Sequence, residues 1–413
     1  MDIGRREFIG ASIGASLSGG FSGSAFGGKE KEVDYSALDA ALKRPVLKRQ
    51  LFSSPVKIAS VELFRSGKFS FVRVRSGDGA EGVAVTNNKA QYVYPIFNKL
   101  VRGCFVGKDA RDLDAIVDSA RRKNYKLSGL ALYCCIAWCE FAVLDMLGKI
   151  VGKGTGDLIG RIRQKEVKMY SASGNRGNTP AEEIKVLRDK IKASGTKAVK
   201  FKVGGRMSNN ADSRPGRTEG LIRTVRKALG DDVTIWADSN GSYDARKGIE
   251  IGKMMAEYGI DMFEEPCPFD HLEETKQVAD AISIPVSGGE QEASLHRFRW
   301  MIANGAVQVV QPDLHYFGGF IRATRVARMA EAAGLKVIPH MSGGGTGYVE
   351  VIHFASFTPN IGPFMEYKGG IEQTGKWYEP PLRFKNGAIN VPKGPGMGVH
   401  IDKKVLSKAE KMV

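Results

Sequence analysis

The chain has 413 residues, 42% of them hydrophobic and 26% charged, which excludes both a disulfide-stapled mini-protein and a largely disordered chain. Lysine and arginine outnumber the acidic residues by 61 to 45, and the net charge of +16 favours anionic partners. Because these basic residues are scattered through every segment and are not clustered with aromatics, we expect no nucleic-acid partner.

The first 28 residues resemble a twin-arginine export signal. Arg5 and Arg6 are followed by Phe8, Ile9 and a weakly apolar stretch rich in Gly, Ala and Ser. We therefore expect a periplasmic or exported protein, or a cytoplasmic one if the signal is not functional. The stretch is too short and too rich in glycine to span a membrane, and no other segment is expected to reach spanning length, so no stable membrane anchor is predicted.

Residues 29–55 form a charged connector, and an α+β lobe is predicted over residues 56–165. Alternating patterns predict strands at 56–63, 69–75 and 80–86, the first two joined by a short turn at 64–68, and helical periodicity runs from 91 to about 148. The tail, 381–413, contains Asn386-Gly387, a typical hairpin turn, and is expected to return to this lobe.

From residue 166 to residue 380, short apolar runs alternate with helical stretches. The runs begin at Val167, Ala198, Val233, Ile260, Ile284, Val307, Lys336 and Ile361. Eight strands that alternate with helices favour an α/β fold with a closed parallel barrel. A doubly wound open sheet is the alternative, but no GxGxxG motif follows the first strand.

Ionisable residues follow seven consecutive strands of this barrel. They are Lys200, Lys202, Asp238, Glu264, Glu290, Asp313, His340 and Glu366. The carboxyl ends of parallel strands meet at one rim, where barrel enzymes carry their chemistry. Burying so many charges is costly unless a metal or a substrate neutralises them, which favours an active site at this rim.

Three carboxylates, Asp238, Glu264 and Glu290, end adjacent strands and are predicted to bind one metal ion. Strands lie about 5 Å apart, so the carboxylate oxygens can converge on one point. An all-oxygen set without His or Cys selects a hard divalent cation, and Mg²⁺ is the expected ion. Alternation along the strand is expected to turn Glu265 away from it.

Two possible bases flank the predicted metal. Lys200 and Lys202 point the same way from one strand, and we expect their repulsion to lower the proton affinity of one of them. On the far side of the barrel, Asp313 is expected to orient His340 and raise its basicity. Glu366 is expected to act as a hydrogen-bond donor to the developing oxyanion if its environment keeps it protonated. Such a set suits removal of the weakly acidic proton next to a carboxylate.

These residues resemble the enolase superfamily, specifically its mandelate racemase subgroup, from about Val56 to the C-terminus. The motifs are KFK at 200–202, DSN at 238–240, EEP at 264–266, GGE at 288–290, QPD at 311–313, PH at 339–340 and MEY at 365–367. The resemblance implies a (β/α)7β barrel, a capping domain made from the N- and C-terminal segments, and one Mg²⁺ per subunit.

The resemblance also implies residue roles. Lys202 resembles the base on one face, modulated by Lys200, and His340 with Asp313 resembles the acid/base on the other. Glu366 resembles the electrophile, and Asn240 resembles a contact to substrate or metal-bound oxygen.

The substrate-binding positions are less specific. The turn predicted before residue 69 is short and basic, which suggests an open site in which Arg65 or Lys68 faces an anionic substrate. Residues after the first and sixth barrel strands are expected to reach the distal end of the substrate: Asn175, Arg176, His315 and Tyr316.

The predicted reaction is dehydration of a sugar acid to a 2-keto-3-deoxy acid. Lys202 or His340 would take the α-proton, and His340 would help to expel the β-hydroxyl. Bases on both faces equally permit racemisation, epimerisation or cycloisomerisation of a 2-hydroxy or sugar acid, and a non-catalytic sugar-acid binder is the remaining alternative. The expected partner is a small-molecule carboxylate, and the protein is expected to be a homo-oligomer.

Overall fold

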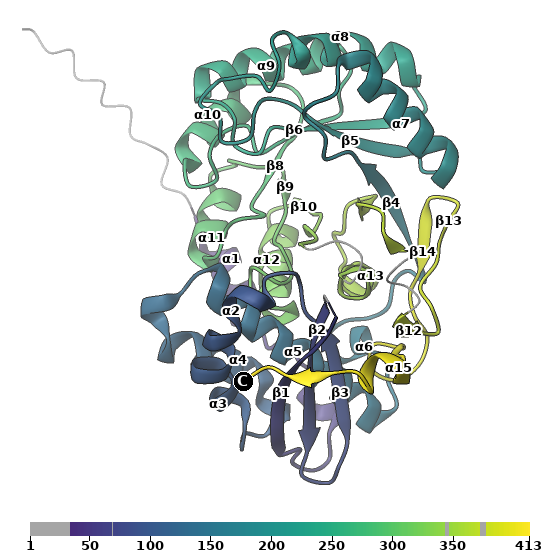
Figure 1. Ribbon diagram of the computed structural model, residues 1–413. Coiled ribbons are helices and arrows are strands. Elements are labelled where there is room, and N and C mark those ends of the chain that lie inside the picture. Colours follow the sequence, from purple (N-terminus) through teal and green to yellow (C-terminus); the bar gives the residue numbers. More distant parts are fainter. Residues whose placement is uncertain (1–33, 68, 343–346, 372–376) are drawn as a thin grey trace, which may run out of the picture. The chain divides into compact units, whose positions relative to one another are not determined.

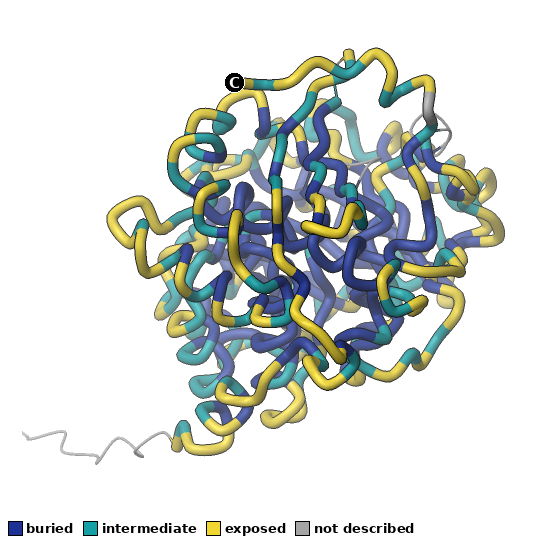
Figure 2. Tube along the Cα trace, turned by 90° about the horizontal axis from the view of Figure 1, so that it is seen from below, coloured by how far each residue is buried: buried dark blue, intermediate teal, exposed yellow. Residues whose placement is uncertain are grey.

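Two large sheets organise the described part of the chain, which comprises residues 34–67, 69–342, 347–371 and 377–413 of the computed structural model (Figure 1). The predicted export signal lies outside these residues. From Asp34 to Val413 the chain forms a single compact unit, and its buried segments run through the interior (Figure 2).

The first sheet is antiparallel and comes from both ends of the chain. Its strands are β1 (Ile58–Ser66), β2 (Phe69–Ser76), β3 (Glu81–Val85) and β16 (Glu410–Lys411), in the order β16-β1-β2-β3. The C-terminus lies beside β1, with Phe64 opposite Lys411 (Figure 1). Ser66 pairs with Phe69, so the turn is shorter than predicted and Arg65 lies within the strand.

Helices follow this sheet. They are α2 (Ala90–Ile96), η2 (Phe97–Val101), α3 (Arg102–Phe105), α4 (Leu113–Lys123), α5 (Leu130–Val151) and α6 (Thr155–Ile159). The long helix α5 packs on β2 and β3. A Cβ atom on Gly82 would lie 2.0 Å from the Ala142 carbonyl oxygen, so only glycine permits this close approach of helix and sheet.

The expectation that no segment reaches spanning length is wrong for α5. Leu130–Val151 is long and apolar enough to cross a membrane by length and composition, yet 89% of its most apolar window is buried inside the protein. A helix that is apolar all round is equally typical of a protein core, and its burial here fits that role.

The second sheet closes the barrel. Its elements alternate as β4 (Glu166–Ala172), α7 (Pro180–Ser194), β5 (Ala198–Lys202), α8 (Arg217–Leu229), β6 (Thr234–Asp238), α9 (Ala245–Glu257), β7 (Met262–Glu264), α10 (Leu272–Ala281), β8 (Val286–Gly288), α11 (Leu295–Ala303), β9 (Val309–Val310), α12 (Phe320–Ala332), β10 (Lys336–Val337), α13 (Tyr348–Phe357) and β11 (Met365–Tyr367). Neighbouring strands pair in parallel from β4 to β10, and β11 pairs with β4. A bridge from Val337 to Ile361 completes the ring. The predicted (β/α)7β barrel is confirmed.

The remaining strands come from the C-terminal segment. They are β12 (Tyr378–Glu379), β13 (Phe384–Lys385), β14 (Ala388–Asn390) and β15 (His400–Ile401), followed by the short helix α15 (Lys403–Leu406). Strands β13 and β14 form the hairpin predicted at Asn386-Gly387, where both residues have positive φ. Strand β14 then pairs with β4, which joins this segment to the barrel.

The segment predicted as a charged connector contains helix α1 (Ser36–Lys43), which packs against α12. Leu38 and Ala41 are buried in this contact, and Arg299 forms an ion pair with Asp39 at 2.6 Å. Leu38 and Ala41 are spaced three apart on one helical face. The charged composition of the segment, from which a connector was predicted, does not reveal this pattern.

One buried carboxylate joins α5 to the barrel. Glu140 on α5 accepts a hydrogen bond from the backbone N–H of Ile321 at the start of α12. Gly319 has a φ of 99°, and a Cβ atom there would lie 2.5 Å from the Glu140 carboxylate, so the close approach requires glycine. Burial raises the pKa of Glu140 to about 8.

Replacement of Glu140 by Gln should flatten the pH dependence of stability. The folded-state pKa of about 8 exceeds the ordinary value of 4.5, so the stabilisation is complete below pH 4.5 and is lost as the pH rises through 8. Gln keeps an acceptor oxygen and does not ionise. From pH 5 to pH 8 the free energy of unfolding of the unmodified protein should fall relative to that of Glu140→Gln, by up to about 1.4 kcal/mol per pH unit. Urea denaturation at both pH values measures this difference.

The matched control is Glu331→Gln, on the exposed face of the same helix α12. This variant should keep the pH dependence of the unmodified protein. An identical pH dependence in Glu140→Gln and Glu331→Gln would contradict the assignment.

Candidate active site

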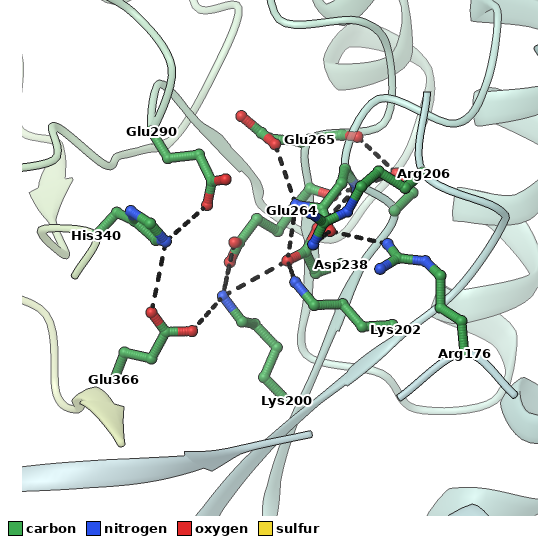
Figure 3. A network of polar contacts seen from close by, with 12 residues as sticks. Arg176, Lys200, Lys202, Arg206, Asp238, Glu264, Glu265, Glu290, His340 and Glu366 are labelled. Carbon is green, nitrogen blue, oxygen red and sulfur yellow. Dashed lines mark hydrogen bonds and ion pairs between the residues drawn. The ribbon is translucent and has the colours of Figure 1, made fainter. Parts of the chain in front are cut away.

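The residues predicted from the strand ends meet at the carboxyl rim of the barrel. Strand register places Lys202 beside Asp238 and Asp238 beside Glu264. Glu290 follows β8, Asp313 and His340 face each other in a bridge after β9 and β10, and Glu366 lies within β11. Figure 3 shows Glu264 and Lys200 between His340 on one side and Lys202 on the other.

Two lysines neutralise the carboxylates at the centre of this rim. Lys200 Nζ donates to both oxygens of Glu264, at 2.6 and 2.8 Å, and lies 3.8 Å from Asp238 Oδ2. Lys202 Nζ donates to Asp238 Oδ2. Lys200 is 1% exposed and Asp238 and Glu264 are completely buried, so these charges depend on one another for compensation.

The predicted repulsion between the two lysines does not govern Lys200. Burial disfavours its charge, but Glu264, Glu366 and Asp238 outweigh that effect and raise its pKa. Burial also opposes ionisation of Asp238, yet Lys202 and Lys200 hold its pKa below the usual range. Lys200 is therefore not the lysine of lowered proton affinity, because its Nζ points at Glu264 rather than at Lys202, and the expectation for one of the pair stays a prediction.

Asp238, Glu264 and Glu290 fit a hard divalent cation by their donor chemistry. Burial, together with the charges of Asp238 and Glu290, raises the pKa of Glu264 to about 7 against the opposing effect of the lysines. Three mutually repelling carboxylates that share one rim supply the oxygen ligands such a cation prefers. Among the described residues no group of three His, Cys, Asp or Glu side chains is arranged to hold a metal ion, and the lysine nitrogens lie against the Asp238 and Glu264 oxygens.

Glu265 does not turn away from this cluster. It is 7% exposed, and its carboxylate accepts a hydrogen bond from Asn240 Nδ2 at 3.5 Å. Burial raises its pKa, and Glu290 and Asp238 add to that effect. Its φ of 43° breaks the regular alternation of the strand, which explains why the alternation argument fails.

His340 lies between two carboxylates. Its Nδ1 is 2.7 Å from Asp313 Oδ2, and its Nε2 is 3.2 Å from Glu290 Oε2. Burial favours the neutral ring, but Glu290 and Asp313 outweigh it and raise the pKa of His340. Asp313 also accepts from Ser342 Oγ at 3.0 Å and from two backbone N–H groups, so its orientation is fixed.

The predicted donor role of Glu366 requires that its environment keep it protonated, and the neighbouring charges act against that condition. Burial opposes its charge, but Lys200, Lys368 and His340 hold its pKa well below the usual range. Lys368 Nζ lies 3.0 Å from Glu366 Oε2 and 3.0 Å from His340 Nε2. The alternation of β11 places Lys368 on the same side as Glu366, and that spacing is the signal that could have identified it.

Gln311 is a further member of the site. Its Nε2 donates to Glu264 Oε2 at 2.9 Å, which completes the partners of that carboxylate together with Lys200. Gln311 belongs to the motif QPD, but the charge argument selects only ionisable residues at the strand ends, and Gln311 is neutral.

Asn240 joins the carboxylate cluster to two arginines. Its Nδ2 faces Asp238 Oδ2 and Glu265 Oε2, and its Oδ1 accepts from Arg176 Nη2 at 2.8 Å and Arg206 Nη2 at 3.3 Å (Figure 3). Arg176 was expected here from the sequence. Arg206, from the loop after β5, was not, because nothing in the sequence indicates where that loop folds.

The other predicted substrate-binding residues differ in where they lie. Arg65 Nε, on β1, donates to the Gly67 carbonyl in the turn that follows, and Lys68 lies outside the described residues. Asn175 Oδ1 accepts from backbone N–H groups of its own loop. His315 and Tyr316 donate their backbone N–H groups to Asp313 Oδ1, at 2.8 and 2.7 Å, while the His315 ring packs edge-on against Phe141 of α5 and burial lowers its pKa to about 4.

Comparison with known proteins identifies relatives of this chain. The sequence model of the family described as enolase C-terminal domain-like matches residues 182–405. D-galactarolactone cycloisomerase of Agrobacterium fabrum is 29% identical over 74% of this chain and 82% of its own length. D-gluconate dehydratase of Thermoproteus tenax is 26% identical over 82% of this chain and 69% of its own length.

Solved structures show the same architecture. A protein of Roseobacter denitrificans described as a racemase is 34% identical, with a TM-score of 0.81 over 86% of this chain and 99% of its own. A mandelate racemase/muconate lactonizing protein of Paracoccus denitrificans, complexed with magnesium, is 25% identical, with a TM-score of 0.79 over 86% of this chain and 99% of its own.

Removal of Lys200 should destabilise the protein strongly when divalent ions are chelated. Lys200→Met leaves Glu264 and Glu366 buried with less counter-charge, and breaking a buried pair in this way costs roughly 3–5 kcal/mol. Glu264→Gln combined with Lys200→Met should recover part of the loss, with a coupling of at least about 1 kcal/mol in a double-mutant cycle measured by urea denaturation.

The control is Lys185→Met, which removes a lysine whose side chain is 77% exposed in its pair with Asp189. It should cause no measurable loss of stability. Equal stability of Lys200→Met and Lys185→Met would refute the dependence of the site on Lys200.

Proposed function

This chain belongs to the enolase C-terminal domain-like family, and from that premise we propose that it is a Mg²⁺-dependent enzyme that removes the proton next to the carboxylate of a sugar acid and eliminates water. The observation that carries the proposal is the placement of Lys202 and His340 on opposite sides of Glu264 in a rim of carboxylates. Relatives named as sugar-acid dehydratases and cycloisomerases support the substrate class.

Asp238, Glu264 and Glu290 are the residues that would hold Mg²⁺. The ion, when bound, supplies positive charge beside the substrate carboxylate as the α-proton leaves. Lys200 and Gln311 both donate hydrogen bonds to Glu264 and keep its carboxylate oriented.

Lys202 and His340 face the substrate from opposite sides, and one of them takes the α-proton. His340, with Asp313 accepting at Nδ1, holds a proton at Nε2 and delivers it to the β-hydroxyl as the bond from carbon to oxygen breaks. Water leaves, and the resulting enol becomes the 2-keto-3-deoxy acid by gaining a proton at carbon 3. Lys368 Nζ lies 3.0 Å from both His340 Nε2 and Glu366 Oε2 and offsets part of the carboxylate charge on that face of the site.

Racemisation, epimerisation or cycloisomerisation is the second candidate. The same two groups on opposite faces support inversion, because a proton removed by one can be replaced by the other. The relative named as a D-galactarolactone cycloisomerase favours this alternative. The substrate decides between them, since elimination requires a leaving group within reach of His340.

We also propose that the protein is exported through a twin-arginine signal at residues 1–28, on the evidence of Arg5, Arg6 and the weakly apolar stretch after them. Assembly into a homo-oligomer stays a prediction.

The proposed function predicts α-deuterium exchange and 2-keto acid formation when the protein is incubated in D₂O with Mg²⁺ and a panel of aldonic, uronic and aldaric acids. Lys202→Met and His340→Gln should each lower kcat by about 10²- to 10⁴-fold, the contribution of a general acid or base. Chelation of divalent ions should abolish both signals.

Lys185→Met, which alters an exposed ion pair, is the control and should behave as the unmodified protein. Exchange without keto acid would favour the racemase or epimerase alternative. Absence of exchange and of keto acid with every member of the panel would overturn the proposal, and an active Lys202→Met would remove that residue from an essential role.

Export is tested by fractionation of cells that produce the full chain. The conservative double substitution Arg5→Lys with Arg6→Lys should retain the protein in the cytoplasm, because twin-arginine recognition reads both residues. Lys31→Gln, beyond the predicted signal, is the control and should leave export unchanged. An equal periplasmic fraction for the double variant would refute the signal.

A further inference from the structure

Two guanidinium groups converge above the carboxylate cluster. Arg176 comes from the loop after β4 and Arg206 from the loop after β5, and both donate to Asn240 Oδ1, at 2.8 and 3.3 Å. Asn240 Nδ2 faces Asp238 and Glu265, so the amide group lies between the carboxylate cluster and the two guanidinium groups (Figure 3).

These two arginines differ from others nearby in having no carboxylate partner. On the neighbouring helix α8, Arg223 pairs with Glu219 at 2.7 Å and Arg226 with Asp261 at 2.8 Å. Within the described residues no Asp or Glu oxygen lies within 4.0 Å of the nitrogens of Arg176 or Arg206, whose shared acceptor is a neutral amide oxygen. Burial lowers the pKa of Arg176 against the opposing effect of Asp238, so its charge is incompletely hydrated and has no direct carboxylate partner among the described residues.

Both arginines stand on loops that the protein holds in place. Arg217, 1% exposed, donates to the carbonyls of Asn175 and Asn178 on either side of Arg176, and also to the Lys202 carbonyl. One buried residue therefore positions the Arg176 loop relative to the strand that carries the catalytic lysine.

The second loop adopts a backbone that non-glycine residues rarely take. Arg206 and Met207 have φ values of 64° and 48°, a conformation that costs free energy and persists only when surrounding contacts impose it. Those contacts are hydrogen bonds from Arg206 N to Ser242 Oγ, at 2.9 Å, and from Met207 N to the Asn240 carbonyl, at 3.0 Å. Both tie the loop to the β6 end, so Arg206 is held next to Asn240.

We propose that Arg176 and Arg206 bind the second carboxylate of a dicarboxylic sugar acid, so that the preferred substrate is an aldaric acid or its monolactone rather than an aldonic acid. This inference rests on the proposed function, because the reacting carboxylate occupies the rim at Asp238, Glu264 and Glu290. A guanidinium fork matches a carboxylate in shape and charge, and two of them without a direct carboxylate partner bind an anion at the far end of the substrate. The carboxylate replaces the neutral amide oxygen as the shared acceptor.

The test compares kcat/KM for an aldarate, the aldonate of the same configuration, which ends in a hydroxymethyl group, and the corresponding 6-phosphate. The unmodified protein should prefer the aldarate. In Arg176→Met and in Arg206→Met, kcat/KM for the aldarate should fall by about 10- to 100-fold, as expected for loss of a charge-assisted hydrogen bond. The ratio of aldarate to aldonate activity should fall at least about tenfold. Arg206→Lys should restore only part of it, since an ammonium lacks the planar fork.

Arg188→Met is the matched control, because Arg188 is an exposed arginine on α7 that donates only to the Ala228 carbonyl in the described structure. It should leave the ratio unchanged, and thermal unfolding of all variants verifies that they fold. An unmodified protein that prefers the aldonate or the 6-phosphate, or arginine variants that lose activity equally on all three substrates, would overturn this inference while leaving the proposed function in place. Failure of the unmodified protein to react with any of them would instead count against the proposed function.

Discussion

The pairing of the Lys200 ammonium with the Glu264 carboxylate, deep in the barrel rim, is the contact on which the remaining site geometry depends. Both groups are almost fully buried, and a buried charge is tolerated only with a well-placed partner. Parallel register brings Asp238 to Lys202, whereas Lys200, which is in register with Trp236, reaches Glu264 through its side chain. Both carboxylates are therefore oriented by lysines of β5, although Asp238 ends the adjacent strand and Glu264 ends the strand beyond it.

The N-terminal lobe is connected to this rim through polar side chains. Asn87, which follows β3, donates to Ser342 Oγ at 3.1 Å, and Ser342 donates to Asp313, the residue that orients His340. Glu140 on α5 meets the start of α12, in the barrel turn that follows Asp313. The acid/base on this face is therefore positioned by contacts from both lobes, which gives the α+β lobe a part in site geometry as well as in covering apolar surface.

The barrel could be predicted from the sequence because parallel strands, buried on both faces, leave short apolar runs whose last polar residue marks the rim. The strand-end residues followed from the same rule. What could not be predicted depends on contacts between distant segments. Lys200 and Lys368 reach Glu366 and lower its pKa, and Glu265 faces the cluster because its backbone leaves the strand conformation. Arg206 belongs to the site only because its loop bends back onto Ser242.

The two faces of Asn240 show how these separate features combine. Its amide group faces the carboxylates and its oxygen faces the arginines, so a side chain without net charge stands between regions of opposite charge. The chain carries a net charge of +16, but its positive charges are not equally compensated at this rim. Lys200 and Lys202 pair with carboxylates, whereas Arg176 and Arg206 share a neutral amide oxygen and are available to an external anion. A substrate-binding site with opposite charges at its two ends orients a ligand before any chemistry begins. The reacting carboxylate of the ligand suits the cation that Asp238, Glu264 and Glu290 would hold, and the distal carboxylate must then meet the guanidinium groups.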